Sequence, residues 1–213
     1  MTIVETPPES LLAESCISVL ETDRLVLRAP RIEDVAAVAE LANNRKIAEM
    51  TANLPFPYRA SDAHAFVETL GATAHSTTFG LFLKREGHLE FAGMCGIGRR
   101  PHETVPELGY WVGEPYWGLG IATEAVRAVI DYVFSETPIE QLSGAARVVN
   151  PASRRVLEKC GFQWCGVGLC QVRALGASVP VDRFQLDRRT WASLRAWGSV
   201  SYTHLTLPTI CSV

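Results

Sequence analysis

The chain has 213 residues, of which 47% are hydrophobic and 20% are charged, with a formal net charge of -3 and a pI near 6.0. These values are typical of one globular domain, and the slight negative charge gives no electrostatic basis for binding nucleic acid. The sequence has neither the roughly 18 continuous apolar residues of a membrane span nor a basic start followed by an apolar run. We expect a cytoplasmic protein, monomeric or homodimeric, that binds neither nucleic acid nor a membrane.

The cysteines and histidines carry no metal-binding pattern. Six cysteines are present without a C-x-x-C pair, which argues against zinc and against a thioredoxin-type site. The five histidines are scattered, so we predict no metal site. Cys160, Cys165 and Cys170 are interpreted as small buried hydrophobic residues in a reducing compartment.

The first third of the chain reads as a leader, a strand and two helices. Residues 1 to about 15 lack periodicity and are predicted to form a disordered leader. A strand is expected at 24–28, closed by a proline, and a helix from 32 to about 43. After a proline-interrupted loop at 54–58, a second helix should begin at Ser61 or Asp62 as its cap.

The middle of the chain predicts three antiparallel strands. Residues 79–85 and 91–99 form two of them, joined by a turn at 86–88, and the third ends at Val112. The glycines of the second strand indicate a bulge or a close approach of another backbone.

A glycine loop that leads into a helix follows the third strand, and it is the most informative stretch of the sequence. Gly118 and Gly120 precede an apolar stripe of four-residue spacing that starts at Ile121 and should end near Glu136, before Pro138. The first turn of a helix has unpartnered N–H groups and positive potential, and glycines let a phosphate approach that backbone. The order strand, glycine loop, helix therefore predicts an anion site made by main-chain donors.

The last third has one well-marked helix between strands. A strand at 142–149 precedes a helix for which Asn150 suits the cap, Pro151 the first position and Gly161 the left-handed end, with Phe162 packing onto Leu157. Strands are expected near 162–169 and 183–187. We predict a single domain over 16–198, and we interpret the uncharged residues 199–213 as a non-native or disordered tail.

Two segments together resemble a known family. Residues 107–125, read as Glu-Leu-Gly-Tyr-Trp-Val-Gly-Glu-Pro-Tyr-Trp-Gly-Leu-Gly-Ile-Ala-Thr-Glu-Ala, resemble the acetyl-CoA motif of the GNAT N-acetyltransferases. Residues 150–162 are similar to the second motif of that family, and residues 21–28 to the start of its subgroup that acetylates ribosomal-protein N-termini. The resemblance covers about residues 20–190. It implies an α/β acyl-CoA N-acyltransferase fold, in which a strongly twisted mixed sheet carries helices on both faces.

The resemblance also implies a cofactor site for acetyl-CoA without a metal. The CoA diphosphate would lie on the backbone of the glycine loop, formed by Trp117, Gly118, Leu119, Gly120, Ile121, Ala122 and Thr123. The pantetheine arm would pair with the strand at Tyr110, Trp111 and Val112, and Asn150 would reach its other side. Asn150 is equally explained as a helix cap.

The implied chemistry is direct attack of a primary amine on the thioester. Glu107 is our candidate general base, and a solvated or cross-strand paired carboxylate is the alternative reading of this residue. A backbone N–H near Val112 is the candidate oxyanion donor. Many relatives place a tyrosine acid where this chain has Leu157, so Ser153 becomes the candidate acid, although a serine on a helix surface explains it as well.

Alternative functions remain open at this point. A nicotinamide site is disfavoured, because its glycine fingerprint belongs to an early strand-helix unit. A non-catalytic module that binds acyl-CoA is made credible by the missing tyrosine. The acceptor is undetermined among a protein N-terminal α-amine, a free amino acid, a polyamine and an aminoglycoside, and we expect the loops at 54–60 and 169–181 to select it.

Overall fold

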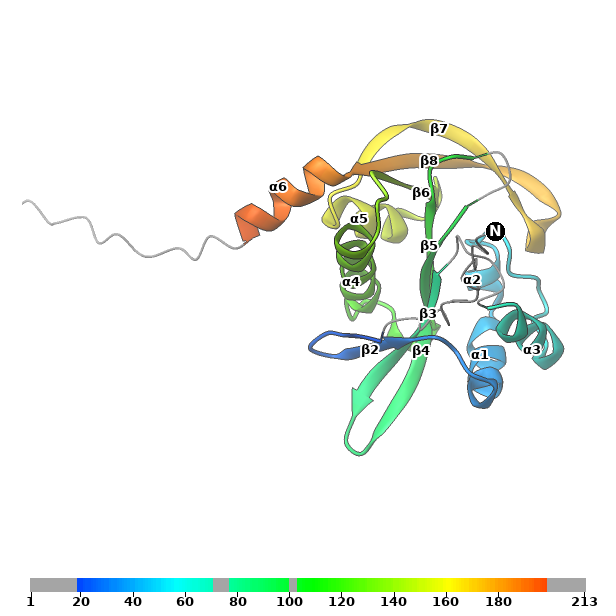
Figure 1. Cartoon of the computed structure of the whole chain (residues 1–213). Coiled ribbons are helices and arrows are strands. Elements are labelled where there is room, and N and C mark those ends of the chain that lie inside the picture. Colours follow the sequence, from blue (N-terminus) through cyan, green and yellow to red (C-terminus); the bar gives the residue numbers. More distant parts are fainter. Residues whose placement is uncertain (1–18, 71–76, 100–102, 199–213) are drawn as a thin grey trace, which may run out of the picture.

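The computed structural model describes residues 19–70, 77–99 and 103–198, and these residues form one mixed sheet with helices on both faces (Figure 1). The eight strands lie in the order β1-β2-β3-β4-β5-β6-β8-β7. Every neighbouring pair is antiparallel except β5 and β6. Helices α4 and α5 cover one face, and α1, α2 and α3 lie on the other. The fold class predicted from the sequence is confirmed.

The elements of the first half are, in chain order, β1 (Leu20–Glu21), β2 (Leu25–Arg28), α1 (Val35–Ala42), α2 (Arg45–Ala48), α3 (Ala60–Thr69), β3 (Thr77–Arg85) and β4 (His88–Gly98). The prediction placed β2, β3, β4, α1 and α3 but missed two short elements, β1 and α2. The predicted cap of α3 is wrong. Arg59 is the N-cap, and the Asp62 carboxylate instead accepts a hydrogen bond from the Arg59 N–H at 2.8 Å.

The glycines of β4 allow close approach of the neighbouring strands, as the sequence predicted. A Cβ on Gly93 would lie 2.3 Å from the carbonyl oxygen of Trp111 in β5. A Cβ on Gly96 would lie 2.3 Å from the carbonyl oxygen of Thr77 in β3. The register between β3 and β4 shifts next to Leu81, so the predicted bulge is present as well.

The elements of the second half are β5 (Glu107–Val112), α4 (Ile121–Glu136), β6 (Gln141–Arg147), α5 (Pro151–Lys159), β7 (Gln163–Val172), β8 (Ala177–Asp187) and α6 (Arg188–Gly198). Short 3-10 turns lie at Ile32–Asp34, Glu114–Tyr116 and Arg173–Leu175. Helix α4 has the predicted bounds, and its apolar stripe is buried.

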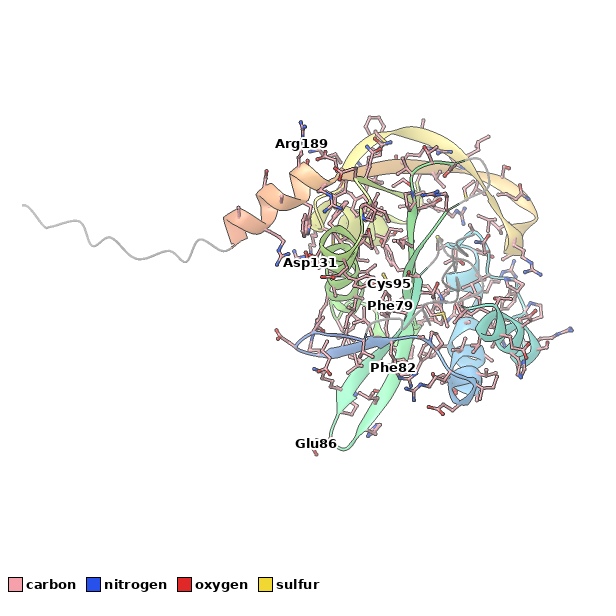
Figure 2. All side chains as sticks on the ribbon, viewed as in Figure 1. Phe79, Phe82, Glu86, Cys95, Asp131 and Arg189 are labelled. Carbon is pink, nitrogen blue, oxygen red and sulfur yellow. The ribbon has the colours of Figure 1, made fainter. Side chains whose placement is uncertain are left out.

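The core consists of two apolar clusters, one on each face of the sheet. Phe79 and Cys95 belong to the cluster under α4 and α5, while Phe82 belongs to the cluster under α1 and α3 (Figure 2). The hairpin of β3 and β4 extends beyond both clusters, with Glu86 near its tip. None of the helices in the described part of the chain is long and apolar enough to cross a membrane.

Helix α5 has both of the ends that the sequence specified. The Asn150 side chain accepts a hydrogen bond from the Ser153 N–H at 3.1 Å, and Pro151 is the first helical residue. Gly161 has φ = 90°, and the Phe162 N–H bonds the Leu157 carbonyl at 3.1 Å. These contacts are the Schellman end that the glycine predicted.

The C-terminal part corrects two predictions. Residues 169–181 are not a loop, because β7 and β8 pair through them in a long hairpin that turns at 173–175. Cys165 is exposed on β7, whereas Cys160 and Cys170 are buried as expected. The sequence analysis also missed α6, which is held at its start by Arg188, whose guanidinium donates to the Thr137 and Ile139 carbonyls at 2.6 and 2.7 Å. The predicted leader, residues 1–15, and the predicted tail, residues 199–213, lie outside the described residues.

Candidate functional site

Strands β5 and β6 separate almost as soon as they meet, and the site is built around that separation. Their parallel pairing consists of Glu107 with Ser143 and Leu108 with Gly144. Beyond these pairs, β5 continues beside β4 while β6 continues beside β8. The sheet therefore opens between the two strands at the level of Gly109.

The backbone of β5 presents polar groups to this opening. The Gly113 N–H bonds the Ala92 carbonyl at 2.8 Å, so Gly113 and, by alternation along the strand, Trp111 direct their backbone groups toward β4. Tyr110 and Val112 must then direct theirs toward the opening. The Val112 carbonyl accepts a hydrogen bond from the Trp117 indole N–H at 2.7 Å. The main-chain edge that the sequence assigned to a pantetheine arm thus faces the opening at Tyr110 and Val112.

Trp111 is not brought together with the other predicted cofactor residues. Its side chain packs in the cluster under α1 and α3, where its ring meets that of Phe91 edge to face. Its backbone pairs with Met94 of β4. The Trp111 side chain therefore packs on the face of the sheet opposite α4 and α5.

The glycine loop has the conformation of an anion cradle. Gly118 and Gly120 have φ values of 77° and 79°, in the left-handed region that disfavours other residues. The Glu124 N–H bonds the Gly120 carbonyl at 3.1 Å, which is the first bond of helix α4. The N–H groups of Ile121, Ala122 and Thr123 precede it and have no intrahelical acceptor. Trp117 and Leu119 are about half exposed, so the loop is open to a ligand.

Arg24, in the turn just before β2, reaches this loop, and it was not among the predicted site residues. Its guanidinium donates to the Leu119 carbonyl at 2.8 Å and to the Glu124 carboxylate at 2.7 Å. The Glu124 side chain is only 19% exposed, because Arg24 and Thr22 cover it. Only the tertiary pairing of two segments about 100 residues apart brings these groups together.

The start of the loop is fixed to the other face of the sheet. Glu114 forms an ion pair with Lys46 and accepts a hydrogen bond from the Asn44 amide at 2.6 Å. These bonds lower the pKa of Glu114, with the contact to Lys46 as the largest cause. The cradle is therefore connected to the helix pair α1 and α2.

Tyr110 and Ser153 meet beside the opening. The Tyr110 phenol oxygen lies 2.8 Å from Ser153 Oγ and donates to the Ser153 carbonyl at 3.1 Å. Burial raises the pKa of the phenol well above its ordinary value, although the hydrogen bond with Ser153 acts in the opposite direction. The phenol consequently keeps its proton throughout the neutral range. Leu157, which stands where many relatives carry a tyrosine, is fully buried and has no proton to give.

Glu107 lies on the opposite side of the sheet from Tyr110. It begins β5 at the pair with Ser143, and it lines a small cavity of about 60 Å³ together with Glu103, Ser143 and Arg183. Because side chains alternate along a strand, Glu107 points toward the face of α1 and α3, while Leu108 and Tyr110 point toward α4 and α5. The two catalytic candidates, Glu107 and Ser153, thus flank the opening from opposite faces.

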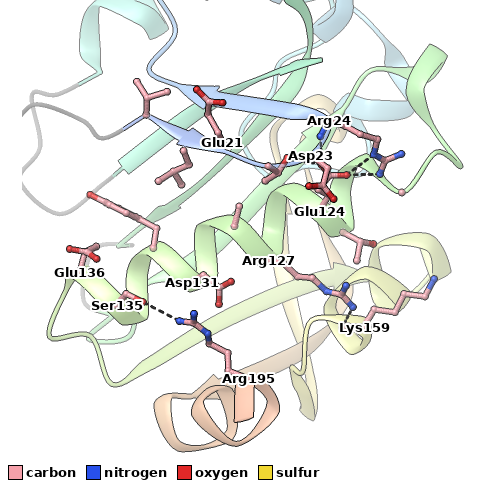
Figure 3. A pocket seen from close by; sticks show the side chains of 17 residues that line it. Glu21, Asp23, Arg24, Glu124, Arg127, Asp131, Ser135, Glu136, Lys159 and Arg195 are labelled. Atoms are coloured by element: carbon pink, nitrogen blue, oxygen red, sulfur yellow. Dashed lines mark hydrogen bonds and ion pairs between the residues drawn. The ribbon is translucent and has the colours of Figure 1, made fainter. Parts of the chain in front are cut away.

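A large groove runs along the outer side of α4, starting at the cradle. It encloses about 1080 Å³, and Gly120 and Thr123 line the end that touches the glycine loop (Figure 3). Acidic and basic side chains alternate along it, among them Arg24, Arg127 and Asp131. No group of three or more metal-ligating side chains occurs in the part of the chain that the structure describes.

The fold and the cradle define an acyltransferase of the kind that binds a nucleotide-linked acyl carrier, and comparison with known proteins gives the family. The acetyltransferase (GNAT) domain family matches residues 24–163, so this chain belongs to the GNAT family and is an N-acetyltransferase. The N-acetyltransferase p20 of Bacillus licheniformis is 27% identical over 176 residues, which are 81% of this chain and 98% of that protein. The ribosomal-protein-serine acetyltransferase of Escherichia coli is 31% identical over 74 residues, 34% of this chain and 41% of that protein.

The solved structures give the same fold. The ribosomal L7/L12 α-N-protein acetyltransferase RimL in complex with coenzyme A superposes with a TM-score of 0.69 at 19% identity, over 80% of this chain and 98% of RimL. At this identity the match concerns the fold. The strand order, the single parallel pair and the helix positions are therefore those of the acetyltransferase fold that the sequence motifs implied.

Proposed function

We propose that this chain transfers the acetyl group of acetyl-CoA to a primary amine by direct attack of the amine on the thioester. The observation that carries the proposal is the opening between β5 and β6 next to a glycine cradle with left-handed Gly118 and Gly120. The gap between β5 and β6 can hold an extended pantetheine arm, and the exposed backbone amides beside the gap can donate hydrogen bonds to a phosphate. These are the two recognition elements that an acyl-pantetheine diphosphate needs.

The cradle and β5 would hold acetyl-CoA as follows. The N–H groups of residues 118–123 bind the diphosphate, whereas the predicted donor at Trp117 already bonds the Glu114 carbonyl at 3.2 Å. The backbone edge of Tyr110 and Val112 pairs with the amides of the pantetheine arm. The Asn150 amide caps α5 through its oxygen, which leaves its N–H₂ group to donate toward the same arm. The thioester then lies where β5 and β6 separate, between the two candidate catalytic side chains.

Glu107 takes the proton that the amine must lose. The amine attacks the thioester carbon, a C–N bond forms, and the oxyanion is stabilised by the N–H of Val112 or Tyr110 on the edge of the opening. Collapse of the intermediate breaks the C–S bond and releases the CoA thiolate. Ser153 donates a proton to that sulfur while it takes one from the phenol of Tyr110. Solvent then returns a proton to Tyr110 and receives the amine's proton from Glu107, so charge and protons balance.

The acceptor that we propose is a protein N-terminal α-amine. An α-amino group has an unperturbed pKa near 7.7 to 8.0, so it needs far less assistance to become neutral than a lysine side chain near 10.4. The likeness to ribosomal-protein acetyltransferases in sequence and in fold supports this choice. Glu107 and Glu103 line the cavity on the face from which the amine would arrive, together with Arg183.

Release of free CoA thiol from acetyl-CoA, in the presence of a panel of amines, tests the proposal. The panel contains peptides with free N-termini, the same peptides with blocked N-termini, free amino acids, polyamines and aminoglycosides. We expect release with free-N-terminal peptides and a mass increase of one acetyl group on the α-amine. Release of CoA thiol only with small amines would show that the acceptor is a small molecule and not a protein N-terminus. Binding of CoA without release of thiol from acetyl-CoA under any condition would indicate a non-catalytic acyl-CoA-binding module.

A further inference from the structure

The Arg24 guanidinium lies beside the glycine loop, and residues 117–123 of that loop include no cationic side chain. Arg24 lies immediately before β2, and its guanidinium contacts both the carbonyl of Leu119 inside the loop and Glu124 in the first turn of α4. A Cβ on Gly120 would lie 3.4 Å from Nη2 of Arg24. The guanidinium is therefore in van der Waals reach of the residue that caps α4.

The guanidinium has donors left for a ligand. Arginine carries five N–H groups in a planar fork. Among the described residues, the Nε–H and one Nη2–H are used by the Glu124 carboxylate, and one Nη1–H is used by the Leu119 carbonyl. One N–H on each terminal nitrogen remains. The Arg24 side chain is half exposed, so these donors are open to solvent and to the groove that begins at Gly120.

The position of this guanidinium is fixed by more than one bond. The Glu124 carboxylate accepts hydrogen bonds from the Arg24 backbone N–H at 3.1 Å and from the Thr22 hydroxyl at 2.6 Å, in addition to the side chain of Arg24 (Figure 3). Both carboxylate oxygens are thus engaged on the side of β2. The carboxylate therefore orients the fork, which makes the site pre-organised.

We propose that Arg24 binds the diphosphate of CoA, with Glu124 as the residue that positions it. Charge-assisted hydrogen bonds between a guanidinium and a phosphate oxygen are stronger than those of neutral amides, and the fork suits two phosphate oxygens. The inference rests on the proposed acetyl-CoA site and adds to it a residue from a different part of the chain. It also gives the turn before β2 a direct role in the site.

The test compares two acetyl donors that differ in the diphosphate. S-acetylpantetheine contains the reactive thioester and the arm but lacks the phosphates and the nucleotide. Arg24→Gln should raise the KM for acetyl-CoA roughly tenfold at unchanged kcat, because a half-exposed charge-assisted contact is lost. The kcat/KM for S-acetylpantetheine should stay the same. A variant that loses activity with both donors equally, or with neither, would overturn the proposal.

A double variant distinguishes a direct contact between Arg24 and the diphosphate from repulsion between Glu124 and the diphosphate. Arg24→Gln alone leaves the Glu124 carboxylate unpaired near the phosphates, which could by itself weaken binding. In the double variant Arg24→Gln/Glu124→Gln that charge is absent. If Arg24 contacts the diphosphate, the double variant stays about as weak as the single one, whereas recovery of the normal KM would show that Arg24 only neutralises Glu124 and would refute the contact.

Arg127→Gln is the matched control, because Arg127 lies on the same groove but donates to the Lys159 carbonyl at 3.1 Å instead of the loop. An equal loss in Arg127→Gln would point to the general potential of the groove and contradict a specific role of Arg24. Calorimetric titration with CoA keeps this test independent of catalysis. If the wild-type protein binds CoA but acetylates nothing, weaker binding by Arg24→Gln still supports the contact, while absence of CoA binding would refute both proposals.

Discussion

The phenol oxygen of Tyr110 lies 2.8 Å from Oγ of Ser153, although the two residues belong to different elements, β5 and the first turn of α5. This contact places a tyrosine hydroxyl next to the candidate acid in a chain whose α5 carries Leu157 at the position where many relatives have tyrosine. The proton for the leaving thiolate can therefore come from a pair of hydroxyls rather than from one side chain on α5.

Removing the acid should slow turnover without weakening donor binding. We expect Ser153→Ala to lower kcat by about 10- to 100-fold, at or below the lower end of the roughly 100- to 10,000-fold range of general acid catalysis, because a thiolate needs a proton less than other leaving groups do. Tyr110→Phe should have a smaller effect in the same direction, and the double variant should be little worse than Ser153→Ala, because the two hydroxyls act in series. Steady-state kinetics and CoA titration measure both quantities. Fully additive losses would argue for independent roles.

Glu107→Gln removes the proposed base. We expect kcat to fall about 100-fold or more, with CoA affinity unchanged, because the side chain lies on the face opposite the cradle. Part of the rate should return as the pH rises, since more of the amine is then neutral without assistance. Glu86→Gln, at the tip of the β3–β4 hairpin, is the control. Normal turnover by Glu107→Gln would remove this residue from the mechanism.

Gly120→Val should impair CoA binding. Gly120 has φ = 79°, so a β-branched residue is strained there, and its side chain would lie against the Arg24 guanidinium. We expect affinity for CoA to fall by at least about tenfold, at a cost of roughly 1 to 3 kcal/mol in stability. Fluorescence titration and urea unfolding check the two effects separately. An unchanged affinity would contradict the cradle.

The described cysteines should differ widely in reactivity. Cys165 is exposed, whereas burial raises the pKa of the Cys160 thiol to about 11 and raises that of Cys95 further. Alkylation requires the thiolate. Brief treatment of the native protein with iodoacetamide near pH 8 should therefore modify Cys165 well before Cys95 and Cys160. Peptide mass spectrometry gives the order, and rapid labelling of Cys95 would be inconsistent with its place in the core.

Glu124 should stabilise the fold in a manner that depends on pH. Burial raises its pKa, but hydrogen bonds from Thr22 and Arg24 outweigh burial, and the net pKa is lowered. A lowered pKa in the folded state gives stability that is present above the unfolded value, about 4.3, and is lost as the pH falls through the folded value. Glu124→Gln should cost about 1 to 2 kcal/mol at pH 7 and progressively less below pH 4. Urea unfolding at pH 7 and pH 3.5 measures the difference, and an equal cost at both would exclude this origin.

The features that local chemistry dictates were predictable from the sequence. The bounds of α4 follow from its apolar stripe and the proline after it, and the two ends of α5 follow from Asn150 and Gly161, whose preferences depend on one turn of chain. The glycine loop was predicted for the same reason. Motif resemblance supplied what local chemistry could not, namely a mixed sheet with helices on both faces.

The features that depend on tertiary contacts were not predictable. Arg24 and Thr22 meet Glu124 only because the turn between β1 and β2 lies beside α4 in the folded chain, and nothing near Arg24 in sequence marks it as part of the site. The hydroxyl pair of Tyr110 and Ser153 depends on the placement of α5 against β5. Residues 169–181 look like a loop because the exposed edge strand β7 has few buried side chains to produce an alternating pattern.

The brief contact between β5 and β6, only two residue pairs long, has a consequence for the order of events. A gap that passes through a sheet gives each reactant a separate entrance, so neither has to leave before the other can approach. Under the proposed function, acetyl-CoA and the amine therefore bind the protein at the same time. The acetyl group is transferred directly from one to the other, without an acyl-enzyme intermediate.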